Sequence, residues 1–379
     1  TAAGFEALNA NTTGTRNTAV GANSLDANTT AADNTAVGYN ALTATTTGQR
    51  LVAVGSAALD GNTTGDDNTA VGYNSLGANT TGAGCIAIGS YALDANTTGG
   101  NIAIGRNALG SNTTGTLNTA LGYDALFTNV DGDNSTAVGY QALYSQEPAS
   151  NVDMYNVMVG HTAGYGLTTG IRNVGVGASV LQGAVTGNDN TAMGHAALAA
   201  NTSGGEQTAV GSLALDANTT GTENTAFGFS ALTNNTTGNS NTALGRKTLF
   251  TNTTGTGNVA VGQGALLANT TASDNVAMGY DALVANTTGA EGVAIGRNSL
   301  DANTTGNNNV GIGYSSLGAN TTGGSNVAVG SYALDANTTS SDNVAVGHHS
   351  LGTNTTGTQN TAIGKGSLFA NTTAGNNTA

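Results

Sequence analysis

The stretch Thr208–Asn224 reads TAVGSLALDANTTGTEN, and almost the whole chain consists of copies of it laid end to end. When each copy starts at its small apolar run, the 379 residues divide into 22 units, of which nineteen are 17 residues long. The exceptions are Ile86–Asn101, Thr136–Asn156 and Thr361–Ala379, with 16, 21 and 19 residues. Self-similarity at a short, fixed period is typical of a solenoid in which each repeat forms one coil. We number the positions within a unit as columns one to seventeen.

The composition is polar and low in charge: 58 residues are Gly, 8% are charged, one is Pro and none is Trp. Such a composition is common in disordered chains, but the apolar residues recur in fixed columns, which predicts an ordered fold. The net charge of −14 comes from scattered side chains without a basic patch, which excludes nucleic acid as a partner. No apolar run is long enough to span a membrane.

Columns one to four read Thr or Val, Ala, a branched apolar residue and Gly, as in Thr18–Gly21. This predicts a strand of three or four residues that ends in a tight turn. Column eight is Leu in nearly every unit, as at Leu25. Because Val20, Leu25 and their equivalents are the only large apolar side chains that each unit regularly offers, we expect both to point into the core.

A single coil buries too little apolar surface to offset the entropy of ordering it, so coil-on-coil hydrogen bonds must hold the fold together. The prediction is therefore an all-β chain: one continuous parallel β-solenoid over residues 1–379, of about 22 coils, with an irregular insertion at about 144–156. Since parallel strands lie about 4.8 Å apart, the coils would form a shaft about 100 Å long.

The orientation of the strand decides what the outside of the coil offers. If Val20 points inward, Ala19 and the glycines form a flat outer stripe that permits close approach of another chain, which favours self-association. In the opposite orientation the Thr and Val side chains point outward, and that apolar face also needs a cover. Both ends of the chain are ordinary repeat. Because solenoids need caps, we expect flanking sequence or neighbouring subunits.

The pattern TAVGxxALxANTTGxxN resembles the head repeats of trimeric autotransporter adhesins. It is closer still to the shaft repeats of bacteriophage tail fibres and related bacterial surface proteins, often written NTAxGxxAL. The resemblance covers essentially the whole chain and implies a left-handed parallel β-roll, commonly trimeric, on an extracellular fibre. The chain departs from the autotransporter heads by three extra residues per coil and by the absence of a coiled-coil stalk, a membrane anchor and a carboxy-terminal chaperone domain.

Column seventeen is Asn in most units, just before the strand. We interpret it as structural, because Asn at a turn caps backbone groups and can stack as an amide ladder. Cys85 stands in this column, where we interpret it as a tolerated small side chain. A single cysteine excludes an internal disulfide and a thiolate metal site.

Columns eleven to thirteen form N-x-S/T sequons in a predicted exposed loop, which suggests a row of N-linked sugars. The alternative is a turn whose Asn and Thr side chains bond the backbone and stack between coils. A third hypothesis, ice binding, usually needs Thr residues two apart on a flat strand, and adjacent Thr residues in a loop do not provide that. The sequon residues are Asn11, Asn28, Asn62, Asn79, Asn96, Asn112, Asn201, Asn218, Asn235, Asn252, Asn269, Asn286, Asn303, Asn320, Asn337, Asn354 and Asn371.

The sequon column fails between Asn129 and Asn201. This interval holds a four-residue insertion, the only proline and a group of tyrosines, and repeat proteins often bind partners where the pattern breaks. The candidate recognition residues are Tyr144, Pro148, Tyr155 and His161, with the search centred on Tyr144 to Tyr155. The alternative is a drifted repeat with a bulge.

The sequence offers no catalytic group, cofactor site or metal site. The histidines His161, His195, His348 and His349 fall mostly in column five, where we interpret them as exposed variants of Tyr, Ser and Arg. The aspartates after Leu alternate with Gly, Thr and Phe, so they form no calcium ladder. The repeat glycines have no helix after them and therefore predict no nucleotide site. A polysaccharide lyase on a β-helix would need a clustered acidic or basic groove, which is missing.

We therefore expect a non-enzyme that forms the shaft of an extracellular or cell-surface fibre. The expected partner is a second copy of the chain, in a homotrimer or filament, together with covalent glycans or surface carbohydrate. The alternatives are a bacteriophage tail-fibre shaft that carries a receptor-binding tip outside this chain, on a virion tail, and an ice-binding solenoid.

Overall fold

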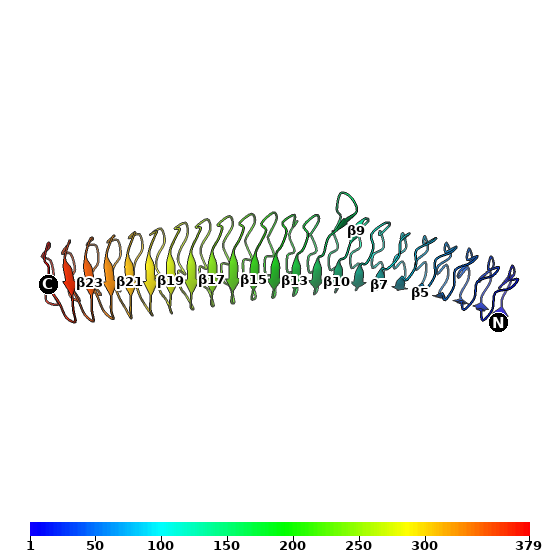
Figure 1. Cartoon of the computed structure of the whole chain (residues 1–379), viewed down its shortest axis with the longest axis horizontal. Coiled ribbons are helices and arrows are strands. Elements are labelled where there is room, and N and C mark those ends of the chain that lie inside the picture. The colour runs from blue at the N-terminus through cyan, green and yellow to red at the C-terminus, as the bar shows by residue number, and fades with distance from the viewer. The chain divides into compact units, whose positions relative to one another are not determined.

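The computed structural model describes residues 1–379, and its only regular elements are short strands. The chain divides into two units, Thr1–Asp189 and Asn190–Ala379, which we call the N-terminal and C-terminal units. In each, the coils follow one another with one short strand per coil, and the strands lie side by side and parallel (Figure 1). No helix could cross a membrane, since none is present.

In the N-terminal unit the main sheet pairs each coil with the next in register, for example Thr18 with Thr35 and Ala19 with Ala36. A second sheet pairs β9 (Gly132–Asp133) with β11 (Val152–Asp153). The main strands are β1 (Ala2–Ala3), β2 (Thr18–Val20), β3 (Thr35–Val37), β4 (Val52–Val54), β5 (Thr69–Val71), β6 (Ile86–Ile88), β7 (Ile102–Ile104), β8 (Thr119–Leu121), β10 (Thr136–Val138), β12 (Val157–Val159) and β13 (Val174–Val176).

In the C-terminal unit the same arrangement recurs without interruption, and Thr208 pairs with Thr225 as Thr18 pairs with Thr35. The predicted fold class, a parallel β-solenoid with a 17-residue repeat, is confirmed in both units. The strands are β14 (Thr191–Met193), β15 (Thr208–Val210), β16 (Thr225–Phe227), β17 (Thr242–Leu244), β18 (Val259–Val261), β19 (Val276–Met278), β20 (Val293–Ile295), β21 (Val310–Ile312), β22 (Val327–Val329), β23 (Val344–Val346) and β24 (Thr361–Ile363).

The side chains of each strand point in the opposite directions from those that we first expected. Ala19 in column two is completely buried, whereas Val20 in column three is 40% exposed, and the other coils follow the same pattern. The prediction that Val20 points inward, with an outer stripe of Ala and Gly, is therefore wrong. The alternative, an outward Thr and Val face, is correct. The prediction that the column-eight Leu is buried is confirmed, since Leu25 has no exposed surface.

The interior of a coil is narrow, and this explains the orientation. Besides the column-eight Leu, most coils bury the small residues of columns two and seven and the Asn side chains of columns eleven and seventeen. Leu25 adopts a left-handed backbone with φ of 52°, a conformation that costs about 1 to 2 kcal/mol for a non-glycine residue. Its burial offsets this cost, and its N–H donates to the Ala41 carbonyl of the next coil at 3.0 Å.

One coil shows how little space the core has. Met158 occupies column two in place of Ala, and the column-eight position of the same coil is Gly164 instead of Leu. A Cβ atom at Gly164 would lie 2.8 Å from Met158 Cγ, and one at Gly175 in the next coil would lie 2.3 Å from Met158 Sδ. A large side chain in column two therefore occurs together with two glycines that make room for it.

The column-seventeen Asn side chains form a buried ladder that joins successive coils. Asn34 Oδ1 accepts a hydrogen bond from Leu51 N at 3.0 Å, and Asn34 Nδ2 donates to the Gly48 carbonyl at 2.8 Å. The structural interpretation of this column is confirmed. Cys85 fits the same place: it is buried, and its N–H donates to Asn68 Oδ1 at 2.8 Å. Burial raises the pKa of the Cys85 thiol.

Candidate functional site: the outer strand face and its two edges

The outward side chains of columns one and three form what we call the outer strand face. Column three carries an exposed apolar residue in strand after strand, and column one adds Thr, Val or Ile. Because large exposed apolar patches often mark interaction sites, this face is a candidate site. The most exposed column-three residues are Val20, Val37, Val54, Ile88, Ile104, Leu121, Val159 and Val176 in the N-terminal unit and Met193, Phe227, Leu244, Met278, Ile295 and Ile363 in the C-terminal unit.

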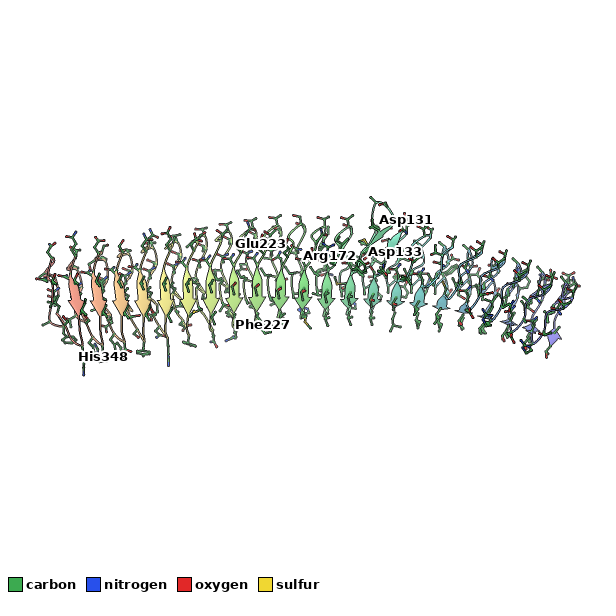
Figure 2. The ribbon with its side chains drawn as sticks, in the orientation of Figure 1. Asp131, Asp133, Arg172, Glu223, Phe227 and His348 are labelled. Atoms are coloured by element: carbon green, nitrogen blue, oxygen red, sulfur yellow. The ribbon has the colours of Figure 1, made fainter.

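The side chains of the outer strand face differ in size, and its hydroxyl groups are confined to column one, which is Thr in 11 of the 22 coils. Phe227 is 51% exposed and pairs with Leu244 on the next strand (Phe227 is labelled in Figure 2). The six strands β18 to β23 all begin with Val, and no strand carries Thr in column three. The arrangement of Thr residues two apart, which the ice-binding hypothesis requires, is therefore absent from this face.

Column five lies just past the end of each strand, and we call this line the strand-end edge. It is rich in aromatic and cationic residues and contains no acidic residue. Figure 2 shows His348 at this edge, on the other side of the strands from Glu223 in column sixteen. His161, His195 and His348 are exposed here, as the sequence suggested, and His349 in column six is half-buried. The aromatic and cationic residues are Phe5, Tyr39, Tyr73, Arg106, Tyr123, Tyr140, His161, His195, Phe229, Arg246, Tyr280, Arg297, Tyr314, His348 and Lys365.

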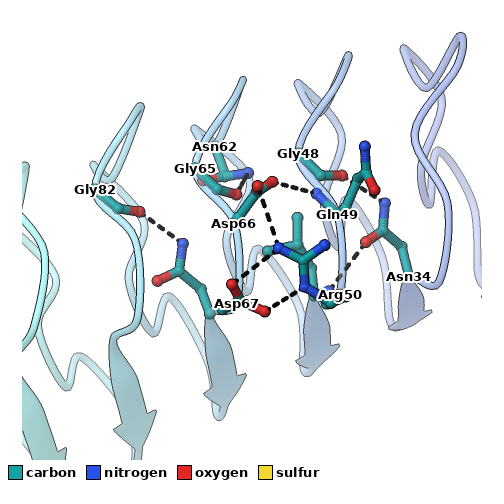
Figure 3. A network of polar contacts seen from close by, with 11 residues as sticks. Asn34, Gly48, Gln49, Arg50, Asn62, Gly65, Asp66, Asp67 and Gly82 are labelled. Atoms are coloured by element: carbon teal, nitrogen blue, oxygen red, sulfur yellow. Dashed lines mark hydrogen bonds and ion pairs between the residues drawn. The ribbon is translucent and has the colours of Figure 1, made fainter.

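Column sixteen lies just before the strand, and we call this line the strand-start edge. Here ion pairs join neighbouring coils: Arg50 Nη2 lies 2.9 Å from Asp67 Oδ2 and 3.3 Å from Asp66 Oδ2 (Figure 3). The hydrogen bond from Arg50 lowers the pKa of the Asp67 carboxyl. The pair Arg172 and Asp189 repeats the arrangement. Because these groups are exposed, each pair adds little to stability.

The sequon asparagines are buried, so the expectation of an exposed loop is wrong for them. Every column-eleven Asn except Asn11 and Asn371 in the end coils is at most 1% exposed. Asn235 is typical: its Nδ2 donates to Gly238 O and to Asn218 Oδ1, both at 2.9 Å. A sugar on Nδ2 would displace these bonds, so the geometry favours the alternative, an amide ladder.

The threonines of the sequon also join the coils. Thr236 Oγ1 in column twelve donates to the Thr253 carbonyl of the next coil at 3.1 Å, while Thr237 in column thirteen is exposed. N-glycosylation stays a prediction, which an intact mass above 36.8 kDa would support.

The residues of the interruption do not form one cluster. Tyr144 stacks on Phe127 and Tyr165, with ring centroids 5.5 and 5.1 Å apart, and burial raises the pKa of its hydroxyl. His161 stacks on Tyr140 in column five. Recognition between Tyr144 and Tyr155 stays a prediction.

The other two candidates lie apart from these stacks. Pro148 is buried, and the exposed Tyr155 donates from its hydroxyl to Asp153 Oδ2 at 3.0 Å. In the coil of the insertion, Gln146 takes the column-eleven place and its Nε2 donates to Asn129 Oδ1 at 2.9 Å, whereas the next coil carries the buried Leu167 in this column. The segment near β9 stands out from the row of coils (Figure 1).

The aspartates of column nine are half-buried beside the strand-end edge. Burial raises the pKa of the carboxyl groups of Asp60, Asp94, Asp216, Asp301 and Asp335. No group of three or more His, Cys, Asp or Glu residues is arranged to hold a metal ion, and the surface contains no pocket.

The chain matches no protein-family model and no curated protein sequence. The assignment of the candidate site therefore depends on its geometry alone. Sequence reasoning considered both orientations of the strand but missed the tyrosines of the strand-end edge. The signal was present, because SYALDANTT occurs twice, at Ser90–Thr98 and Ser331–Thr339, each time one coil after a column-five Tyr.

Proposed function

We propose that the chain is the structural shaft of an extracellular or cell-surface fibre, and that copies of it associate side by side through the outer strand face. The observation that carries the proposal is the row of apolar side chains in column three, which are exposed or partly exposed on the strands of both units. Burial of one such side chain contributes about 1.5 to 3 kcal/mol. A face that repeats such a side chain from coil to coil therefore strongly favours association of two chains.

The unequal sizes of the side chains on the outer strand face support a protein partner. Phe227, Leu244 and Met278 project further than the Val residues beside them. Such protruding side chains can pack into depressions on the surface of a partner protein. A second copy of the chain offers the same period of one coil, so matching can continue over many coils. The resemblance to fibre repeats agrees with this proposal and with a homotrimer or a filament as the assembly.

Sedimentation of the intact chain tests the proposal. We expect an assembly, and we expect Phe227→Asp/Leu244→Asp to shift it toward the monomer, because two carboxylates would be buried in the interface. The control is Thr237→Asp/Thr254→Asp, which adds the same charge at exposed column-thirteen positions of the same two coils and should leave the assembly intact. A chain that sediments as a monomer at all concentrations would refute side-by-side association.

A further inference from the structure

The strand-end edge carries the same arrangement of tyrosines in both units. Column five reads Tyr39, Ser56, Tyr73, Ser90 and Arg106 over five successive coils of the N-terminal unit. In the C-terminal unit it reads Tyr280, Arg297, Tyr314, Ser331 and His348. In both, tyrosines occupy alternate coils, Ser follows the second Tyr, and a cationic or titratable residue ends the series.

A third tyrosine completes each series. Tyr91, in column six, meets Tyr73 of the preceding coil edge to face, with centroids 5.2 Å apart and an interplanar angle of 78°. Tyr332 meets Tyr314 in the same way, at 5.2 Å and 77°. We call Tyr39, Tyr73 and Tyr91 the N-terminal tyrosine track, and Tyr280, Tyr314 and Tyr332 the C-terminal tyrosine track. The recurrence of this geometry in two units argues against chance.

In the N-terminal tyrosine track, the spacing leaves no ring stacked on another within column five. In the C-terminal tyrosine track, Arg297 lies over the Tyr280 ring and His349 stacks on Tyr332 at 4.9 Å, so fewer ring faces are open there. Rings on alternate coils are about 10 Å apart, twice the spacing of strands in a sheet, and Ser56 between Tyr39 and Tyr73 has no ring to fill the gap. Tyr39 is 57% exposed. Tyr123 and Tyr140 show the opposite case: they lie on neighbouring coils and stack at 5.6 Å, so each covers the other.

Polar groups accompany each track. Asp94 lies three residues after Tyr91, and Asp335 lies three residues after Tyr332, both half-buried in column nine. The Asp94 carboxylate accepts a hydrogen bond from Asn74 Nδ2, which leaves further lone pairs free to accept others. Arg297 lies over the Tyr280 ring at 5.4 Å, so a guanidinium donor stands beside the exposed ring. Rings, carboxylates and guanidinium groups together suit a ligand with apolar faces and many hydroxyl groups.

We propose that each tyrosine track binds an extended β-linked polysaccharide that runs along the strand-end edge. Sugar rings present a C–H face that packs on an aromatic ring, and their hydroxyls bond carboxylate and guanidinium groups. The two-coil spacing is close to the length of one disaccharide in an extended β-linked chain, so every second sugar stacks on a tyrosine. An exposed, open edge fits a polymer better than a small ligand, which requires a pocket.

A second copy of the chain is the competing occupant, and charge argues against it. The strand-end edge carries Arg106 beside one track and Arg297 beside the other, with no acid in column five. Two identical edges in parallel register would place each arginine against its own copy, and the aspartates Asp94, Asp281 and Asp335 against theirs, which is unfavourable.

Native gel electrophoresis of the intact chain tests the proposal, with hydroxyethylcellulose, xylan or galactomannan in the gel. We expect retardation by at least one of these β-linked polymers and none by pullulan, an α-linked glucan without the extended shape. The variant Tyr73→Ala/Tyr314→Ala should weaken the apparent affinity at least tenfold, since it removes the central ring of both tracks. No retardation by any of the three β-linked polymers would overturn the proposal.

Two further variants make the test specific. Tyr140→Ala removes a ring of similar exposure whose face is already covered by stacking, so retardation should not change. Ser56→Tyr fills the gap between Tyr39 and Tyr73, and it should weaken binding if the spacing matters; stronger binding would contradict the two-coil fit. If Tyr73→Ala/Tyr314→Ala changes the sedimenting mass but not the retardation, the occupant is a second copy, and the polysaccharide proposal fails. Because Phe227→Asp/Leu244→Asp tests assembly separately, the two proposals can fail independently.

Discussion

Asn28 shows what a single residue contributes to the coil. Along most of column eleven, the carboxamide oxygen accepts a hydrogen bond from the Asn of the following coil, as Asn218 accepts one from Asn235. The coil after Asn28 carries Thr45 in this column, and Asn28 Oδ1 is left buried without a partner. A buried acceptor without a hydrogen bond costs about 1 to 3 kcal/mol.

We therefore expect Thr45→Asn to stabilise the protein by about 1 kcal/mol, because its Nδ2 would donate to Asn28 Oδ1. The gain is moderated by loss of the bond from Thr45 Oγ1 to Asn62 O at 3.0 Å. Urea unfolding gives the change in free energy, and Thr47→Asn at an exposed position two residues away should have no effect. A destabilised Thr45→Asn variant would show that the amide ladder does not determine stability here.

The pair Met158 and Gly164 gives a second prediction at this scale. Met158→Ala should destabilise by about 2 to 4 kcal/mol, because it leaves a cavity. Gly164→Leu should also destabilise, by about 1 to 3 kcal/mol, because its Cβ would crowd Met158. Together they restore the usual Ala and Leu of a coil, so the double variant should be more stable than the sum of the single changes predicts. Additive effects, measured by urea unfolding of all four proteins, would contradict this account of the core.

At the scale of the strand and its turn, the sequence was informative about position but not about orientation. The strands at Thr18–Val20 and its equivalents lie where the repeat predicted them. A three-residue strand, however, offers only Thr18 and Val20 on one face and Ala19 on the other, and this short alternation fits both orientations. The outcome depends on Asn28 and Asn34, which fill the interior with polar groups. The burial of so many Asn side chains cannot be inferred from the hydrophobicity of the residues in the sequence.

The candidate site was predictable only in part, for a related reason. His195 and His348 lie at an exposed turn, as the column pattern suggested. The edge-to-face contact of Tyr73 with Tyr91 joins different columns of different coils, so it appears only once the coils are stacked in register. The sequence therefore indicates which residues recur and leaves open which of them meet.

The turn that closes each strand depends on its column-four glycine, and this gives a matched pair of variants. Gly228 has φ of 143°, and a Cβ there would lie 2.5 Å from the Gly245 carbonyl oxygen of the next coil. Gly364 has a similar φ of 125° but nothing within 4 Å of its Cβ position. Gly228→Ala should thus destabilise by about 2 kcal/mol or more beyond Gly364→Ala, which adds only backbone strain. Equal unfolding midpoints for the two variants would contradict the close approach of successive coils.

For the molecule as a whole, the acidic residues predict how stability changes with pH. The column-nine carboxyls have a raised pKa in the folded state, so the folded protein binds more protons than the unfolded chain between the ordinary value of 3.8 and the raised one. The free energy of unfolding should therefore rise as the pH falls through that window. Asp33, Asp67 and Asp189 have a lowered pKa. Their contribution is lost as the pH falls below 3.8, so stability should then decline.

Asp301→Asn isolates one of these groups, because it removes the half-buried charge. We expect the variant to be more stable than the parent at pH 7 and to lose part of this advantage as the pH falls toward the raised pKa of Asp301. Urea unfolding at pH 7, 5 and 4 provides the comparison. A constant difference between the two proteins at all three values would show that burial of Asp301 does not shift its titration.

The central claim is that column two points into the coil and holds a small residue in all coils but that of Met158, whereas column three points outward and holds a large residue in all coils but the first. Urea unfolding of Ala209→Met and Val210→Met tests it most directly. The natural chain carries Met in column three at Met193 and Met278, but in column two only at Met158, beside two glycines. We predict that Ala209→Met lowers the free energy of unfolding by about 2 to 3 kcal/mol through overpacking, whereas Val210→Met changes it by less than about 1 kcal/mol. A larger loss for Val210→Met than for Ala209→Met would contradict the account.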